Sequence, residues 1–418
     1  MNRKKESKVV PNVRFKGFTD DWKQRKLSEI ADKVTEKNAG LQYIETFTNS
    51  AEFGIISQRD FFDHDIAKMS SLGGYYIVRN EDFVYNPRIS TSAPVGPINR
   101  NKLGRTGVMS PLYTVFRPHD VDITYLEYFF KSKYWNSFMN FNGDSGARSD
   151  RFSIKDSVFF EMPIPLPYIE EQRKIGEHLT QLDCFITLHQ QKITLLIKLK
   201  KAMLEKMFPK KGTVIPEIRF NGFANAWEQR KLGDIVERVT RKNQNIVSDL
   251  PLTISAQYGL IDQNEFFDKR VASKDVSGYY LIYNGEFAYN KSISNDAPWG
   301  AIKRLDRYEN GVLSTLYIVF KIKNEEKTNS DFIATYYDTN IWHKDIKAIA
   351  AEGARNHGLL NITPADFFET KLKFPKNVLE QQKIGIYFGN IDHLITLHQR
   401  KLDMLKKLKS ACLNEMFI

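Results

Sequence analysis

The stretch VRFKGFTDDWKQRKLSEIADKVTEKN at residues 13–38 returns as IRFNGFANAWEQRKLGDIVERVTRKN at residues 218–243, about 205 positions further along the chain. Other segments repeat in the same order: GYYIVRNEDFVYN (74–86) and GYYLIYNGEFAYN (278–290), GVMSPLYTVF (107–116) and GVLSTLYIVF (311–320), EQRKIG (171–176) and EQQKIG (380–385). Solenoid repeats recur every ~20–50 residues, whereas this period has the length of a whole domain. The sequence therefore predicts two similar domains, each with its own core, built to engage two similar but non-identical targets.

The composition is that of a basic globular protein. The 418 residues are 42% hydrophobic and 13% aromatic, which is enough for substantial cores, and the length suggests two or three domains. Lysine and arginine (61) exceed aspartate and glutamate (50), giving a formal charge of +11. Such a charge suits a polyanionic partner because basic surface attracts phosphate at long range, although many basic proteins bind no nucleic acid.

Cysteine content and hydropathy indicate a reducing, intracellular environment. The two cysteines, Cys184 and Cys412, are too few for a disulfide framework and wrongly spaced for a zinc site. No run approaches the roughly 18–20 apolar residues of a membrane span. The N-terminal MNRKKESKVVPN is charged and lacks the apolar segment of a secretory signal. We therefore expect a cytoplasmic protein.

Each repeat begins with a mixed region that contains one early tryptophan, Trp22 or Trp227. A helix is expected over residues 26–37 and, in the second copy, over 231–242. Phrases such as GYYIV, EDFVYN and LYTVF have the β-branched and aromatic composition of strands, with Gly, Pro and Asn between them. Further helices are expected near 123–135 and 331–347, so both regions are predicted to be α+β globules.

Each repeat ends in a long helical segment with the 3.5-residue apolar period of a coiled coil. The seam residues, which alternate four and three apart, are Ile175, Leu179, Leu182, Ile186, His189, Ile193, Leu196, Lys200, Met203 and Met207, and then Ile384, Phe388, Ile391, Ile395, His398, Leu402, Leu405, Lys409, Cys412 and Met416. The two sets match position for position. Two matched heptad helices in one chain are expected to pack together.

We expect the two helices to pair antiparallel. Each helix of about 36 residues would span roughly 55 Å, and antiparallel pairing would place the two globules at opposite ends of the rod rather than crowding them together. His189 and His398 would then meet near the midpoint as polar register markers. Lys200 and Lys409 are expected to bury their stems in the seam and keep their charged heads in water.

Motifs for catalysis are missing from the sequence. It contains no G-x-x-x-x-G-K-[ST] phosphate loop, no H-E-x-x-H and no Cys-x-x-Cys. The nearest approach to an amino-methyltransferase motif, residues 86–88, lacks its second proline and its aromatic residue. Glu171 and Glu380 occupy the start of each long helix, where a carboxylate favours the positive end of the helix dipole and needs no catalytic role.

The polar loops that follow the tyrosine-rich strands combine a shared framework with exchanged side chains. The framework residues that recur are Asn86, Ser90, Ala93, Pro94, Gly96 and Arg100, matched by Asn290, Ser294, Ala297, Pro298, Gly300 and Arg304. Arg88, Thr91, Lys102 and Arg105 do not recur in kind. A second pair of loops, 146–151 and 353–358, behaves in the same way. A shared scaffold with exchanged polar side chains is what a DNA reader needs, because phosphate contacts position a domain and base-edge contacts specify sequence.

These loops supply the candidate DNA-binding residues. In the first repeat they are Arg88, Ser90, Thr91, Arg100, Lys102, Arg105, Arg148 and Arg151. In the second repeat they are Lys291, Ser292, Asn295, Lys303, Arg304, Arg307, Arg355 and His357. Any single arginine in such a loop can equally be solvated or paired within the protein, so the hypothesis applies to the set.

The whole layout resembles the specificity subunit of a Type I restriction-modification enzyme. The resemblance rests on the entry segment Phe-x-Gly-Phe…Trp, on the Gly-Asp/Glu-Phe-x-Tyr-Asn strand, and on Pro-Leu-Pro…Glu-Gln-x-Lys-Ile leading into a long helix. It extends over essentially the full chain, and the ordered set occurs twice. The second copy departs from the pattern at residues 374–376, where Phe-Pro-Lys replaces the two prolines.

The resemblance implies two pseudo-symmetric, mixed α/β target recognition domains joined by a long antiparallel two-helix coiled coil. The implied boundaries are 1–165 and 211–373 for the recognition domains, with helical spacers at 166–210 and 374–418. Each domain would read one half of a bipartite, asymmetric site on double-stranded DNA, and the helices would act as a ruler. The seam residues from Ile175 to Leu196 and from Ile384 to Leu405 would form this spacer and partner-binding element.

The resemblance also implies that this chain does no chemistry and carries no cofactor or metal. Two methylation subunits would bind the helices and carry S-adenosylmethionine, and restriction subunits with motor and nuclease activity would bring ATP and magnesium. Two alternatives stay open: a stand-alone DNA-modifying enzyme with a degenerate active site, and a two-headed scaffold that binds only proteins. A scaffold would lack the steep salt dependence that phosphate contacts impose on DNA affinity.

Overall fold

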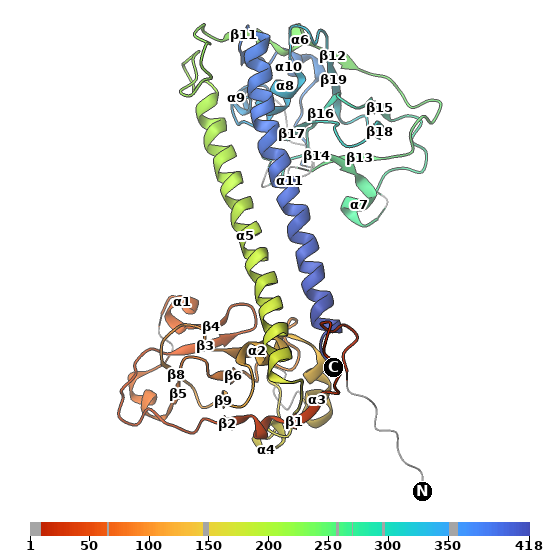
Figure 1. The fold of residues 1–418 in the computed structure, drawn as a ribbon. Helices are drawn as coiled ribbons and strands as arrows, with labels where there is room; N and C mark the ends of the chain where they lie inside the picture. Colours follow the sequence, from red (N-terminus) through yellow and green to blue (C-terminus); the bar gives the residue numbers. More distant parts are fainter. Residues whose placement is uncertain are drawn as a thin grey trace. The chain divides into compact units, whose positions relative to one another are not determined.

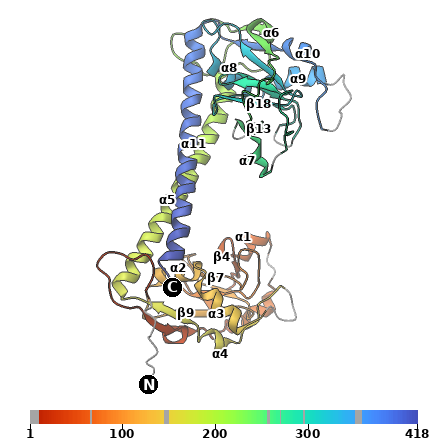
Figure 2. The same cartoon turned by 90° about the vertical axis from the view of Figure 1, so that its right-hand side faces the viewer.

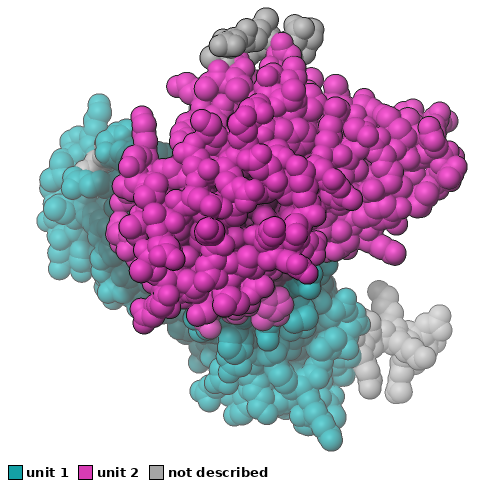
Figure 3. Space-filling model, turned by 90° about the horizontal axis from the view of Figure 1, so that it is seen from above, with its two compact units in different colours: residues 1–190, 400–418 teal, residues 191–399 magenta. Residues whose placement is uncertain are grey.

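The computed structural model describes residues 10–64, 67–144, 150–255, 259–269, 271–294, 297–350 and 358–418. The chain divides into two compact units, coloured separately in Figure 3. Unit 1 comprises residues 1–190 together with 400–418, and unit 2 comprises residues 191–399. Each unit therefore contains the globule of one repeat and a C-terminal piece of the other repeat's long helix.

Unit 1 is built on a four-stranded antiparallel sheet (Figure 1). The strands lie in the order β2 (Ala31–Lys33), β9 (Thr114–Pro118), β6 (Phe83–Tyr85) and β7 (Ile98–Arg100). Three strand pairs surround it: β1 (Lys23–Lys26) with β10 (Pro163–Leu166), β3 (Phe47–Ser50) with β4 (Gly54–Ser57), and β5 (Tyr76–Val78) with β8 (Gly107–Met109). The short helices are η1 (Leu27–Glu29), α1 (Gln58–Phe62), η2 (Met69–Gly74), α2 (Ile123–Lys131), α3 (Tyr134–Asn142) and α4 (Asp156–Phe159).

Unit 2 repeats this topology. Its four-stranded sheet has the order β12 (Val236–Val239), β19 (Ile318–Ile322), β16 (Phe287–Asn290) and β17 (Ala301–Arg304). The strand pairs are β11 (Glu228–Lys231) with β20 (Lys371–Phe374), β13 (Leu252–Ser255) with β14 (Gly259–Asp262), and β15 (Tyr280–Tyr283) with β18 (Asn310–Leu313). Its short helices are α6 (Leu232–Ile235), α7 (Gln263–Phe267), α8 (Ser330–Tyr337), α9 (His343–Ala350) and α10 (Pro364–Phe368).

The central strand pair of each sheet places two phenylalanines opposite each other. Phe83 pairs with Phe116, and their buried rings stack with centroids 5.5 Å apart. In unit 2, Phe287 pairs with Phe320 at 5.3 Å. Cross-strand aromatic pairs of this kind stabilise a sheet and fix its register. The strands expected from GYYIV, EDFVYN and LYTVF are thus confirmed, and the mixed helix-and-sheet fold agrees with the predicted class.

The helix expected over residues 26–37, and its counterpart over 231–242, is wrong. A single short turn is followed at once by strand β2 or β12. The backbone N–H of Leu27 donates to Met162 O, and that of Val34 donates to Val115 O, so this segment pairs with distant strands. Sheet pairing has overridden the helical composition of the segment, as tertiary contacts often do. The helices expected near 123–135 and 331–347 are present, each divided into two.

The two long helices, α5 (Ile169–Met207) and α11 (Val378–Glu415), are confirmed, and in each unit a segment of one lies beside a segment of the other (Figures 1 and 2). In unit 1, His178 lies 3.8 Å from Cys412 and Asp183 is paired with Lys409. Residue numbers rise along one helix as they fall along the other, so the pairing is antiparallel. All the seam positions predicted from the heptad pattern are buried or half-buried.

The expectation that Lys200 and Lys409 hold their heads in water is wrong. Lys200 Nζ lies 2.7 Å from a carboxylate oxygen of Asp338 and 2.7 Å from one of Asp392, and Lys409 is paired with Asp183. Burial alone would lower the pKa of Lys200, but the two carboxylates outweigh it and raise that pKa. Each seam lysine meets an aspartate from the opposite helix, a partner that the apolar pattern does not reveal. The meeting of His189 with His398 and the placing of the globules at opposite ends stay predictions.

Candidate nucleic-acid interface

The loop between β6 and β7 and its counterpart between β16 and β17 share one backbone scaffold. The side-chain Oδ1 of Asn86 accepts a hydrogen bond from the backbone N–H of Arg88 at 3.0 Å. Asn290 Oδ1 accepts from the N–H of Ser292, also at 3.0 Å. An asparagine that bonds two residues ahead fixes the start of a turn. The asparagine therefore recurs because the turn needs its side chain. The residue two positions later contributes only its backbone N–H, so its side chain is free to differ.

The apex of the loop is closed in the same way in both units. Ser90 and Ala93 exchange two backbone hydrogen bonds at 3.0 and 3.1 Å, and Ser294 and Ala297 exchange two at 3.2 Å. The framework Ser and Ala thus hold a tight turn. In unit 1, Thr91 lies between them and is exposed, and the two backbone hydrogen bonds do not involve its side chain.

A glycine is required where each loop returns to the sheet. Gly96 has φ +83° and Gly300 has φ +77°, in the left-handed region that favours glycine. A Cβ at Gly96 would lie 2.1 Å from the carbonyl oxygen of Asn86, and one at Gly300 would lie 2.2 Å from that of Asn290. Any other side chain would therefore displace the scaffold, which explains why this position recurs in both repeats.

The described end of the second predicted segment is hydrogen-bonded to this loop in each unit. In unit 1 the N–H of Ile89 donates to Asp150 O at 3.1 Å, and that of Phe152 donates to Pro87 O at 2.7 Å. In unit 2 the N–H of Ile293 donates to Gly358 O at 2.9 Å. Residues separated by about 60 positions in the sequence are thereby joined into one surface. Arg148, Asn295, Arg355 and His357 lie outside the described residues.

Arg88 is an exposed arginine of this surface. Its side chain is 72% exposed, and its guanidinium approaches Asp150 only at 4.0 Å. Ser292 occupies the equivalent position in unit 2 and is also exposed. Arg151 is half-buried beside Arg88. A long cation in one unit and a short hydroxyl in the other, on the same scaffold, would contact different base edges.

The framework arginines are engaged within their own units. Arg100 lies 3.2 Å from Glu127 and 3.3 Å from Glu81, and its side chain is only 10% exposed. Arg304 lies 2.6 Å from Asp306 and 2.8 Å from Asp331. These pairs bind the loop strands to the neighbouring helices α2 and α8. They give both arginines a structural role, and a DNA contact by either one stays a prediction.

Three further candidate residues also have carboxylate partners. Lys102 lies 3.3 Å from Glu127, Arg105 lies 2.8 Å from Glu45, and Lys303 lies 2.6 Å from Asp338. Lys291 donates instead to the carbonyl oxygen of Ile362 at 3.4 Å, and burial lowers its pKa. Ser90 and Arg307 are exposed. Lys102 and Arg105 remain about half exposed, whereas Lys303 is one-quarter exposed, and a DNA contact by any of them stays a prediction.

A surface groove of about 410 Å³ extends from the exchanged loop of unit 1 toward β5 and the β8–β9 turn. Its lining includes Arg151 and Pro87 from the predicted surface, and also Lys33, Tyr76 and Leu112, which the sequence interpretation did not select. These three residues have counterparts of the same kind in the second repeat. Differences between the repeats do not reveal these residues, because their kind is the same in both repeats.

The long helices carry a second kind of surface. Exposed apolar side chains occupy matched positions: Phe185, Leu188, Met404 and Leu408 in unit 1, and Leu195, Leu199, Leu394 and Leu397 in unit 2. Leu195 is 64% exposed and Met404 is 58% exposed. Grouped apolar side chains exposed on a helix face mark interaction sites.

Among the residues that the structure describes, no group of three His, Cys, Asp or Glu side chains is placed to hold a metal ion. None of the described helices is long and apolar enough to cross a membrane.

Comparisons with known proteins agree with this architecture. Residues 19–199 match the model of the Type I restriction modification DNA specificity domain. The Type I restriction enzyme MjaVIII specificity subunit of Methanocaldococcus jannaschii is 29% identical over 338 residues, covering 75% of this chain and 74% of that protein. The crystal structure of the Type I restriction-modification S subunit from M. genitalium has the same fold, with a TM-score of 0.60 over 98% of this chain and 99% of its own at 13% identity. The chain is therefore similar to the DNA specificity subunits of Type I restriction-modification systems over most of its length, and it has the fold of such a subunit.

Proposed function

We propose that each globule reads one half of a bipartite, asymmetric site on double-stranded DNA. The observation that carries this proposal is the shared loop scaffold, which presents Arg88 in unit 1 and Ser292 in unit 2 from the same hydrogen-bonded turn. A fixed backbone with exchanged polar side chains changes which bases are contacted without changing how the domain is held. Two such readers that differ in their loops would require two different half-sites.

The mechanism on this proposal is binding without chemistry. The long side chain of Arg88 can donate two hydrogen bonds to the major-groove edge of guanine, whereas the short hydroxyl of Ser292 cannot. Basic groups elsewhere on each unit would neutralise phosphates, in keeping with the net charge of +11. The chain's own residues would thus select the DNA, and base methylation or cleavage would be performed by other subunits.

The paired helices would set the distance between the half-sites. Two modules on one rod gain affinity through a high effective concentration, but only when both can engage at once. A site with the wrong spacer would bind through one module and lose that gain. We accordingly assign DNA recognition to two domains and spacing to two helices. The recognition domains are residues 1–165 and 211–373, and the helices are residues 166–210 and 374–418.

The exposed apolar helix faces support two methylation subunits as partners. The same four positions of α5 and α11 carry apolar side chains, and each unit displays two from each helix. A surface that occurs twice suits a partner present in two copies. S-adenosylmethionine would be carried by those subunits, and ATP and magnesium by restriction subunits. Since the substrate is cellular DNA, we place the assembly in the cytoplasm.

Mapping DNA methylation tests this proposal. The chain is co-expressed with a methylation subunit in a host without DNA methylation, and methylated adenines are located across the genome by single-molecule sequencing. We expect one gapped motif with two unlike halves. A stable co-purified complex that produces no motif would contradict the proposal and favour a protein-binding scaffold, whereas methylation by the purified chain alone would show an enzyme.

A further inference from the structure

We infer that a second surface, which occurs once in each unit, binds the DNA backbone irrespective of base sequence. We call it the shared surface; it comprises Lys33, Lys37, Tyr76 and Leu112 in unit 1 and Arg238, Lys242, Tyr280 and Leu316 in unit 2. The inference rests on the proposed DNA recognition and names side chains for a contact that the exchanged loops do not supply.

The centre of the shared surface in unit 1 is a lysine stacked on a tyrosine. Lys37 Nζ lies 3.3 Å from the ring centroid of Tyr76, and the backbones of the two residues form a β-bridge. The side chain of Lys37 is exposed, so its ammonium is held in place and remains in contact with solvent. A cation held over an aromatic face keeps its charge. Because the position of its side chain is already restricted, it loses little conformational entropy when it pairs with an anion.

Unit 2 has the same arrangement although its loops differ. Lys242 Nζ lies 4.3 Å from the ring centroid of Tyr280, and these residues also form a β-bridge. The guanidinium of the exposed Arg238 lies 3.4 Å from the hydroxyl of Tyr280. Arg238 occupies the position of Lys33, which lines the unit 1 groove beside Tyr76. Cationic and aromatic groups are therefore retained at equivalent places in the two units.

An exposed leucine completes the surface in each unit. Leu112 is 59% exposed and Leu316 is 55% exposed. Each lies in a turn whose serine Oγ accepts the leucine N–H at 3.4 Å. The strand registers pair Tyr76 with Met109 and Tyr280 with Leu313, three residues before each leucine. The matching registers therefore place both leucines on the same side of their tyrosines.

Double-stranded DNA fits this composition because its backbone is the feature that both half-sites have in common. Residues that differ between the units suit base edges, and exposed residues that recur suit phosphate and sugar. The ammonium would pair with phosphate and the leucine would pack on the apolar face of deoxyribose. In unit 1 the groove joins Arg151 of the exchanged surface to Tyr76 and Leu112, so both sets can meet one ligand.

Acidic neighbours decide which basic residue contributes most. Lys33 is paired with Asp156, and Asp156 also lines the groove. The equivalent position in unit 2 is Pro364, by the backbone alignment of the adjoining loops. Lys33 therefore contributes less than Arg238, and Lys37 and Lys242 are the pair whose geometry is closest in the two units.

The test measures the salt dependence of DNA binding by the full-length chain co-purified with a methylation subunit. The variant K37Q/K242Q removes one cation from each shared surface. Affinity is measured at several salt concentrations on a duplex that carries the methylated motif and on an unrelated duplex. We expect the slope of log K against log salt to become shallower by about 2 on both duplexes, because each phosphate contact contributes roughly 0.9. The methylated motif should not change.

A matched control is K26Q/K231Q. These lysines, on β1 and β11, are also duplicated and about half exposed. Unlike Lys37 and Lys242, they are paired with carboxylates, Lys26 with Glu161 and Lys231 with Glu369. The control removes the same charge from each unit, so a general charge effect would change its slope equally. We expect its slope to match that of the unaltered complex. Thermal unfolding confirms that both variants are folded.

Four outcomes would overturn the inference. A K37Q/K242Q slope equal to that of the control, with the unaltered complex binding normally, would refute the backbone contact and leave the proposed function standing. An altered methylation motif would show that the shared surface reads bases. Loss of the methylation subunit with an unchanged slope would show that it binds protein. If the unaltered complex neither binds DNA nor yields a motif, the proposed function fails and the inference fails with it.

Discussion

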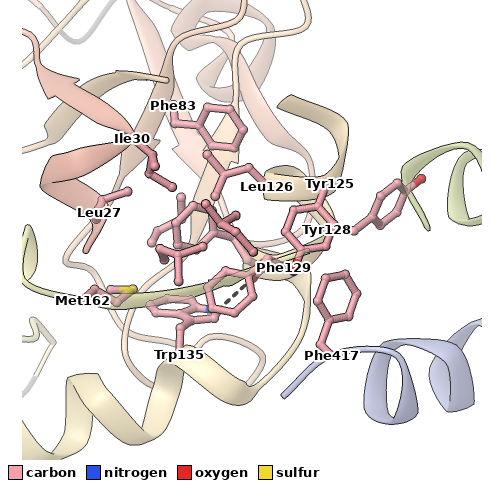
Figure 4. Close-up of a cluster of buried hydrophobic side chains, with 14 of the residues drawn as sticks. Leu27, Ile30, Phe83, Tyr125, Leu126, Tyr128, Phe129, Trp135, Met162 and Phe417 are labelled. Carbon is pink, nitrogen blue, oxygen red and sulfur yellow. Dashed lines mark hydrogen bonds between the residues drawn. The ribbon is translucent and has the colours of Figure 1, made fainter. Parts of the chain in front are cut away.

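The ring of Phe417 lies against the ring of Tyr125 with centroids 5.4 Å apart, although Phe417 follows the end of the second repeat's helix and Tyr125 belongs to the first repeat's globule (Figure 4). Phe208, at the end of the first repeat's helix, lies 5.7 Å from Phe332 in the unit 2 core. Phe417 and Phe208 are each 1% exposed. Each globular core is thus completed by a phenylalanine from the other repeat.

Removing either phenylalanine should destabilise one unit. We expect F417A to lower the free energy of unfolding of unit 1 by about 3–5 kcal/mol, because it leaves a cavity among large aromatic side chains. Hydrogen exchange should increase in α2 and the unit 1 sheet, while unit 2 remains protected. Phe141 is 90% exposed, so F141A is the matched control and should change stability by less than about 0.5 kcal/mol. Equal exchange in both variants would refute the role of Phe417.

Replacing Arg88 should alter only one half of the recognised motif. R88A removes the exposed guanidinium and leaves the turn intact, because Asn86 bonds to the backbone of residue 88 and not to its side chain. We expect relaxed base preference at one or two positions of one half-site, with a loss of about 1–3 kcal/mol in discrimination there. Methylation mapping measures this directly. Changes in both halves would contradict the assignment of one unit to one half-site.

Shortening both helices should alter the spacer alone. Deleting residues 187–193 and 396–402 removes one heptad from each helix, which keeps the seam in phase and shortens the rod by about 10 Å. We expect the complex to accept a different spacer length while both half-site sequences stay the same. An altered half-site sequence would show that the helices do more than separate the globules.

Acid should weaken unit 1 through Glu127, whose side chain lies 2.7 Å from Lys131 and 3.2 Å from Arg100. Burial raises the pKa of Glu127, but these cations and Lys102 outweigh it and hold the pKa below its usual value. A carboxyl group with a lowered pKa contributes stability that is complete above its unfolded pKa of about 4.3 and is lost as the pH falls through the folded value.

The E127Q variant measures this contribution. We expect it to cost about 1–3 kcal/mol at neutral pH, because Arg100, whose side chain is 10% exposed, then keeps only Glu81 as a carboxylate partner. Urea unfolding from pH 7 down to pH 3 should show a shallower loss of stability for E127Q than for the unaltered chain. Parallel curves would mean that Glu127 does not control the acid response.

The sequence predicted the duplication and the heptad helices because both are periodic features that local chemistry determines. It predicted the wrong structure for residues 26–37, since the pairing of Val34 with Val115 depends on a strand about 80 residues away. It did not predict the carboxylate partners of Lys200 and Arg100, because ion pairs between residues far apart in the sequence produce no periodic pattern. Comparison of the repeats selected the loop of Arg88, whose contact with DNA stays a prediction, and did not select Lys37, which recurs beside a tyrosine as Lys242.

The central claim is that each unit reads one half-site, and exchanging a globule tests it most directly. In the chimera, residues 13–165 also replace residues 218–373, so that both globules derive from the first repeat. The copied globule would receive Phe208 where the original receives Phe417, which preserves the aromatic contact in each core.

The measurement is the methylation motif of this chimera, co-expressed with a methylation subunit in a host without DNA methylation. On the proposed arrangement, the antiparallel helices would relate the two identical readers by a two-fold axis, and the two DNA strands are also antiparallel. We therefore expect a gapped palindrome, with the first half-site followed, after the spacer, by its reverse complement. A motif that keeps two unlike halves would contradict the claim that each unit reads one half of the site.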